Sequence, residues 1–252
     1  MIAYHGLDIN PQTACAAVAK NRHIFVPWTA RGRGQLDIVL ELASSFAVDN
    51  SAYTAWRSGN PIPLDGWRGY YEWVRELTFI PSFDWAVIPD TIDGSEAEND
   101  FLLAEWPLGA AGVPVWHLHE RLERLERLVS GWPRVALGSS GVFSEPGMPG
   151  WWRRMGEAMA ICCDGAGRPK VKLHGLRQLD PSLRAIPYSS ADSTTVGRNI
   201  GMDSRWEGTY SPPTKEWRAV VIAERLEALP CARSWVAPQQ TEFDLFSMGV
   251  GT

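Results

Sequence analysis

Short apolar runs that close on a polar residue recur along this chain, and helix-like stretches separate nearly all of them. Eight such runs occur, at residues 1–6, 23–28, 45–49, 85–90, 113–119, 134–141, 170–175 and 185–195. Regular alternation of strand and helix is typical of a parallel sheet with helices packed against it. Eight units in about 250 residues match a TIM barrel. We therefore expect an α/β fold, a single-domain (β/α)8 barrel.

The stretches between these runs carry helix signals. Ser95 and Glu98 have the spacing of a capping box. The leucines of 120–130 recur at helical spacing between alternating charges, which predicts an amphipathic helix. Helices are expected at 11–20, 35–44, 65–78, 95–105, 120–130, 151–163, 176–183 and 214–229.

An open, doubly wound sheet is the alternative arrangement of the same elements. The first strand–helix turn has no G-x-G-x-x-G sequence, and no P-loop sequence occurs in the chain. The barrel is therefore favoured, with its core over 1–200 and a C-terminal helix and tail over 201–252 that pack on it.

Composition limits the kinds of partner. The net charge is −5 and there is no basic tail, so a nucleic acid would have to be held by a local patch of positive charge. No apolar segment has the length of a membrane span, and the chain does not start like a signal peptide. The 4 cysteines show no C-x-x-C spacing, which argues against a structural zinc or a disulfide framework. We expect a soluble, cytoplasmic protein without a zinc subdomain, a catalytic metal or another cofactor.

Residues that can do chemistry follow the expected strands. In TIM barrels the reactive groups lie at the carboxyl ends of the strands. The residues found there include His5, His117, His119, His174, Asp49, Asp90 and Asp192. An aspartate after a strand is often only a helix cap, so it is their coincidence that indicates an active site.

Two kinds of chemistry fit these groups. Carboxylates can perform a glycosidic displacement, in which one attacks the anomeric carbon and another handles the proton of the leaving group. Alternatively His117, His119 and His174 with an aspartate can bind a metal that activates water, as in barrel hydrolases. Those hydrolases usually carry an H-x-H pair on the first strand, whereas here the pair follows the fifth.

Five short motifs occur in the order seen in the tRNA-guanine transglycosylase superfamily. They are Asp49-Asn50-Ser51-Ala52-Tyr53, Ile88-Pro89-Asp90, Leu137-Gly138-Ser139-Ser140, Leu173-His174-Gly175-Leu176 and Ala191-Asp192-Ser193. The chain resembles the short phage and genomic-island branch of this superfamily, whose members are related to enzymes that place 7-deazaguanine bases in DNA. The resemblance covers residues 1–200.

The resemblance implies a pentosyltransferase that exchanges guanine for a 7-deazaguanine base. Asp192 matches the nucleophile that attacks ribose C1′, and Asp49 matches the acid/base carboxylate. Asp90 matches the carboxylate that holds the amidine edge of the base. His117 or His119 falls where the family has a glutamine that contacts the base.

Other expected contacts follow from the same motifs. The backbone N–H groups of Gly138 and Ser139 match those that hold the base carbonyl, and a base could stack near Tyr53. Asn50 and His174 complete the expected base-binding set. Phosphates of DNA or tRNA would be held by arginines after the strands, namely Arg31, Arg33, Arg57, Arg177, Arg198 and Arg205.

The chain also departs from the family. Asn50-Ser51-Ala52 replaces Ser-Gly-Gly after the first aspartate and narrows the space beside the base. The C-terminal zinc site of three cysteines and a histidine is absent, and with it part of the surface that docks tRNA. A barrel that only binds a nucleobase or a nucleic acid is therefore a third possibility.

Overall fold

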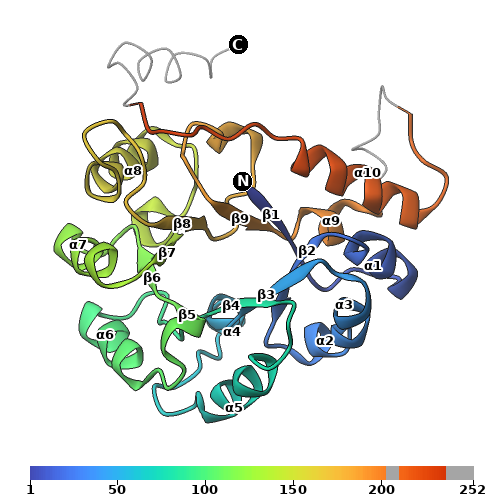
Figure 1. Ribbon diagram of the computed structural model, residues 1–252, viewed down its shortest axis with the longest axis horizontal. Coiled ribbons are helices and arrows are strands. Elements are labelled where there is room, and N and C mark those ends of the chain that lie inside the picture. Colours follow the sequence, from blue (N-terminus) through green and yellow to red (C-terminus); the bar gives the residue numbers. More distant parts are fainter. Residues whose placement is uncertain (203–209, 237–252) are drawn as a thin grey trace.

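The computed structural model describes residues 1–202 and 210–236, and its strands form one parallel sheet rolled into a barrel (Figure 1). The strand order is β5-β4-β3-β2-β1-β9-β8-β7-β6. The strands are β1 (Ile2–Gly6), β2 (His23–Pro27), β3 (Ser45–Asp49), β4 (Phe83–Val87), β5 (Gly112–Val113), β6 (Val115–His117), β7 (Arg134–Gly138), β8 (Lys172–Gly175) and β9 (Ser190–Ser193). The expected TIM-like barrel is confirmed.

The ring is completed by one expected strand that changes partner in its middle. β5 pairs with β4, β6 pairs with β7, and only Pro114 separates the two pieces. The Pro114 carbonyl accepts a 2.9 Å hydrogen bond from the Ala136 N–H. Proline has no N–H to give to a neighbouring strand, so the ladder is interrupted on one side here. The nearly closed barrel is therefore bridged here by the covalent chain at Pro114, without a hydrogen-bonded ladder between β5 and β6.

Helices surround the sheet (Figure 1). The α-helices are α1 (Gln12–Ala19), α2 (Ala30–Arg33), α3 (Leu36–Leu42), α4 (Ala52–Arg57), α5 (Arg68–Leu77), α6 (Glu96–Glu105), α7 (Leu122–Gly131), α8 (Pro149–Cys162), α9 (Thr195–Asn199) and α10 (Lys215–Glu227), with short 3-10 turns η1 (Gly109–Ala111), η2 (Gly141–Phe143) and η3 (Pro181–Leu183). The capping box of α6 is present: the Ser95 hydroxyl accepts from the Glu98 N–H, and the Glu98 carboxylate accepts from the Ser95 N–H. No described helix is long and apolar enough to cross a membrane.

The chain between β8 and β9 differs from expectation. The helix predicted over 176–183 is wrong, because only η3 is helical there and Arg177 has a left-handed φ of 56°. The segment that follows α10 is hydrogen-bonded to the chain on either side of β8: the Ala232 N–H donates to the Arg184 carbonyl, and the Trp235 N–H donates to the Gly167 carbonyl. The last strand also begins later than its apolar residues, at Ser190.

Two hydrophobic clusters flank the sheet. The larger lies between the strands and the helices, and the smaller fills the barrel around Tyr4, Phe25 and Trp85. Because side chains alternate along a strand, Tyr4 faces the interior and His5 faces outward. His5 Nε2 lies 2.9 Å from Glu227 Oε1 of α10, so this histidine is not at the site. At the carboxyl ends of the strands, the side chains that point into the barrel are polar.

Candidate active site

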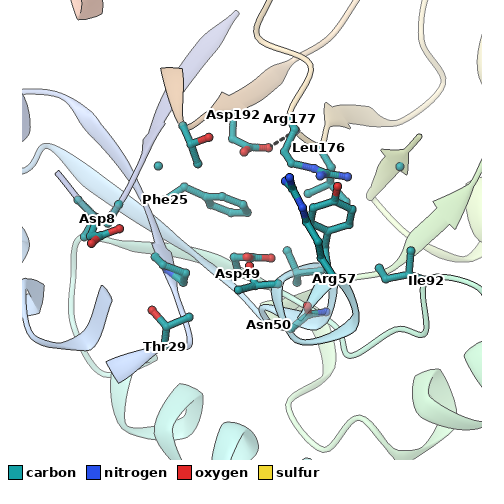
Figure 2. Close-up of a pocket in the computed structure, with 18 of the residues that line it drawn as sticks. Asp8, Phe25, Thr29, Asp49, Asn50, Arg57, Ile92, Leu176, Arg177 and Asp192 are labelled. Carbon is teal, nitrogen blue, oxygen red and sulfur yellow. Dashed lines mark hydrogen bonds between the residues drawn. The ribbon is translucent and has the colours of Figure 1, made fainter. Parts of the chain in front are cut away.

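A cavity of about 860 Å³ opens at the carboxyl end of the barrel (Figure 2). It brings together most of the side chains that the sequence singled out. Those that line it are Asp49, Asn50, Tyr53, Asp90, His117, Gly138, Ser139, Asp192, Arg31, Arg57, Arg177 and Arg198. They come from strand ends, loops and the short helices α2, α4 and α9, which are far apart in the sequence, so the barrel assembles the site.

Three of the expected site residues that the structure describes do not line this cavity. His119 stacks on His117 with ring centroids 5.7 Å apart, and its Nδ1 bonds to the Ser140 hydroxyl. His174 is fully buried inside the barrel, against Trp85. Arg33 is exposed in α2 outside the lining, and Arg205 falls outside the described residues.

Asp192 is held by the chain that follows β8. Its Oδ1 accepts a 2.7 Å hydrogen bond from the Arg177 N–H, which the left-handed conformation of Arg177 turns toward β9. His174 Nε2 lies 3.4 Å from the same oxygen, and His174 Nδ1 bonds to the Ser190 hydroxyl at 2.9 Å. Burial lowers the pKa of His174, against the opposing effect of Asp192, and so favours a neutral ring beneath the carboxylate. These contacts fix one face of Asp192.

Asp49 experiences a different environment at the end of β3. Burial, followed by the negative charges of Asp192 and Asp90, raises the pKa of its carboxyl to about 7. A hydrogen bond from the Ser51 N–H and the charge of Arg177 oppose this shift. A proton therefore remains on Asp49 over a pH range in which an ordinary aspartate is ionised.

Asp90 is clamped between two side chains. Asn50 Nδ2 donates to Asp90 Oδ1 at 2.6 Å and to the Ile88 carbonyl at 2.9 Å. On the other side His117 Nε2 lies 2.7 Å from Asp90 Oδ2. Asn50 also accepts from the Ala52 N–H, so it fixes the chain after β3 as well as Asp90. Asn50 thus fills space beside the cavity and orients one of its carboxylates.

A buried network that the sequence did not reveal lies behind this clamp. Glu120 accepts hydrogen bonds from the His117 N–H and from Asn99 Nδ2, both at 2.8 Å. Asn99 accepts in turn from the Thr91 N–H at 2.7 Å, and Arg124 pairs with Glu120 at 2.7 Å. These hydrogen bonds link Thr91, the residue after Asp90, to His117. Its one signal in the sequence is Asn99, a poor helix former inside α6.

Positive charge lines another part of the cavity. The Arg177 guanidinium lies 3.3 Å from the centre of the Tyr53 ring. Burial raises the pKa of the Tyr53 phenol, but Arg177 and Arg57 outweigh it, so the net effect lowers that pKa. In Figure 2, Arg57 and Arg177 lie on one side of Asp49, and Asp8 and Thr29 on the other.

Sequence reasoning missed several lining residues. Asp8 follows β1 and lies 3.7 Å from Arg31, and Thr29 caps α2 by accepting from the Gly32 N–H. Both come shortly after a strand, which is the signal that could have found them. The apolar wall from Phe25, Ile92 and Leu176 carried no comparable signal, because isolated apolar residues fit any core.

The described residues contain no group of three or more His, Cys, Asp or Glu side chains arranged to hold a metal ion. His117, His119 and His174 instead contact Asp90, Ser140 and Ser190. Comparison of the chain with protein-family models, with curated proteins and with solved structures gave no match.

Proposed function

We propose that this protein is a transglycosylase that exchanges guanine for a 7-deazaguanine base in DNA or tRNA through a covalent bond to Asp192. One observation carries the proposal. Asp49 and Asp192 share a cavity, and the pKa of Asp49 rises to about 7 in part because Asp192 is negatively charged. Two carboxyl groups whose environments separate their protonation states suit an acid and a nucleophile.

The reaction would proceed in two displacements. Arg177 and His174 contact Oδ1 of Asp192, which leaves Oδ2 to attack ribose C1′. The C1′–N9 bond breaks, and the proton of Asp49 passes to the departing guanine. The incoming base then gives a proton back to Asp49 and attacks C1′, and the bond to Asp192 breaks. Atoms and charge balance over the cycle, and no hydrolysis occurs.

The polynucleotide would be held at the rim. Four arginines line the cavity, namely Arg31, Arg57, Arg177 and Arg198. Flipping a nucleotide out of a duplex costs a few kcal/mol of stacking, which phosphate contacts from these side chains would offset. This local charge fits a protein whose net charge is −5.

An exchange assay tests the proposal. Labelled guanine is incubated with the protein and either duplex DNA or tRNA, and label in the polynucleotide is counted. The wild type should incorporate label, and Asp192→Asn should abolish incorporation. Asp49→Asn should reduce it by about 100-fold or more, the usual contribution of a general acid. A protein that binds guanine but incorporates none into either polynucleotide is a binding barrel, and the proposal is then wrong.

A further inference from the structure

An exposed tryptophan lies beside the cavity. Trp56 belongs to α4 and is 37% exposed, whereas Trp67, Trp116 and Trp151 are at most 1% exposed. Trp56 does not line the cavity, but it is next to a residue that does, because its ring centroid is 5.7 Å from that of Tyr53. The indole therefore offers accessible aromatic surface just outside the cavity.

The helix that carries Trp56 is fixed at its start. The Asn50 side chain accepts a 2.8 Å hydrogen bond from the Ala52 N–H and donates to Asp90 Oδ1 at 2.6 Å. Ala52 is the first residue of α4, so the amide that orients Asp90 also anchors this helix. A group that is already held in place loses little freedom when it binds a ligand. The position of Trp56 relative to the cavity is therefore set before a ligand binds.

Tyr53 has less ring surface to offer. The Arg177 guanidinium lies 3.3 Å from the centre of the Tyr53 ring and covers that face. A base could stack on this face only after the guanidinium moved away. The exposed indole of Trp56 needs no such movement. Of the two aromatic rings of α4, Trp56 is therefore the one that is open to a stacked base.

The surroundings of Trp56 suit a nucleic-acid strand. Arg57 follows Trp56 directly and lines the cavity together with Thr54. Grooves that bind single strands combine positive charge along the backbone with aromatic rings on which bases stack. A nucleotide in the cavity is joined through a phosphate to each of its neighbours in the strand. Arg57 can contact such a phosphate while the neighbouring base lies on Trp56.

We propose that Trp56 is a stacking platform for the base next to the reacting nucleotide. The inference rests on the proposed function in taking a nucleic-acid strand as the ligand of the cavity. Every base has an aromatic face, so the platform accepts any neighbouring base. It discriminates between kinds of ligand instead, because a free nucleoside has no neighbouring base to place on Trp56. The substrate class assigned by this platform is a strand rather than a nucleoside.

Equilibrium binding tests the platform. The variants are made in Asp192→Asn, which leaves the strand intact, and are titrated with a fluorescent single-stranded oligonucleotide, as DNA and as RNA, that has one guanine in its middle. Trp56→Ala should weaken binding by about 5- to 150-fold, the range for the loss of one stacked base. Trp56→Phe, which keeps an aromatic ring, should weaken it less. Trp217→Ala removes an indole that is 65% exposed on α10 and, as the matched control, should have no effect.

Abasic substitution identifies the base that stacks. Removing the base on the 5′ or on the 3′ side of the guanine should weaken binding on one side only. On that side Trp56→Ala should cause no further loss, because both changes remove the same contact. On the other side it should retain its full effect. An equal loss on all oligonucleotides means that Trp56 acts only through the structure of α4 and overturns the proposal, as does unchanged binding of the intact strand.

The outcomes distinguish this inference from the proposed reaction. With Asp192 present, Trp56→Ala should lower guanine exchange at subsaturating oligonucleotide by about the same factor as binding. Exchange that Trp56→Ala leaves unchanged overturns the platform but not the reaction. The expected binding pattern without any exchange contradicts the reaction but not the platform. A protein that binds no oligonucleotide at low salt contradicts both.

Discussion

Three aspartates end up in one cavity, yet their surroundings give them different chemistry. Asp90 is bound on both oxygens by Asn50 and His117. Asp192 receives a backbone N–H from Arg177. Asp49 lies near both negative charges, and its pKa rises to about 7. Residue type alone does not separate these roles, because they depend on neighbours brought in from other strands.

Asp49→Asn should stabilise the protein at neutral and alkaline pH. The folded state holds the proton of Asp49 up to about pH 7, whereas the unfolded chain releases it near the ordinary aspartate pKa of 3.8. Stability is therefore lost as the pH rises through this window. Asparagine has no charge to bury, and we expect a gain in unfolding free energy of up to about 4 kcal/mol at pH 8.

Urea unfolding at pH 8 and at pH 4 measures this effect. The gain should shrink to well under 1 kcal/mol at pH 4, because the folded wild type is then protonated at Asp49 and the unfolded chain is near the midpoint of its titration. Asp65→Asn, at an exposed turn, is the matched control and should show no such pH dependence. A variant that is less stable than the wild type at pH 8 would contradict the raised pKa.

At the residue scale, the sequence located the acids better than the histidines. A strand end is visible in the sequence, but the direction of a side chain depends on the phase of the strand. His5 and His117 both lie in strands that lead to the cavity, yet His5 faces α10 and His117 faces the site. Asp49 and Asp192 point into the barrel, as do Ala47 and Ser190 two residues before each of them.

At the scale of elements, the turn after β8 carries two contacts at once. The Arg177 N–H donates to Asp192 while the Arg177 guanidinium lies over Tyr53. Its left-handed φ of 56° costs a non-glycine residue about 1 kcal/mol. This turn replaces the helix expected over 176–183, which helical propensity alone could not exclude.

Substitution of Arg177 separates the backbone from the side chain. Arg177→Gly and Arg177→Ala both remove the guanidinium, but only glycine adopts a φ of 56° without strain. The glycine variant should be about 1 kcal/mol more stable than the alanine variant in chemical unfolding. Equal stabilities, or a more stable alanine variant, would argue that this turn is not strained.

Glu120 offers a second test at this scale, because it joins α6, β6 and α7. Glu120→Ala leaves Arg124, 2% exposed, without one of its two carboxylate partners. Breaking a buried pair in this way costs about 3–5 kcal/mol. Arg127→Ala in the same helix removes only an exposed pair with Asp100 and should cost less than about 1 kcal/mol. Similar losses in thermal unfolding would contradict the structural role of Glu120.

For the whole molecule, the barrel followed from the repeated strand–helix pattern. The order of the eight apolar runs was enough to predict the architecture, without an argument from any single residue. The split at Pro114 and the hydrogen bonds of the segment after α10 to Gly167 and Arg184 did not follow, since both depend on which parts of the chain become neighbours. Long-range packing rather than local pattern decides such features.

Charge distribution over the whole molecule predicts salt-dependent binding to nucleic acid. Arg198→Ala should lower the slope of log affinity against log salt concentration by about one, because one phosphate contact is lost. Arg33→Ala is the matched control: it is exposed but outside the cavity lining, and should leave the slope unchanged. Fluorescence anisotropy with a labelled duplex measures both. Undetectable binding at low salt, or identical slopes, would favour a free nucleoside as the ligand.

The covalent intermediate tests the central claim most directly. Protein is mixed with a guanine-containing oligonucleotide without an incoming base, quenched in acid and analysed by intact mass and peptide mapping. We expect an adduct on Asp192 whose mass equals that of the oligonucleotide lacking one guanine, and no adduct in Asp192→Asn. An adduct on another residue, or full exchange activity in Asp192→Asn, would contradict the account.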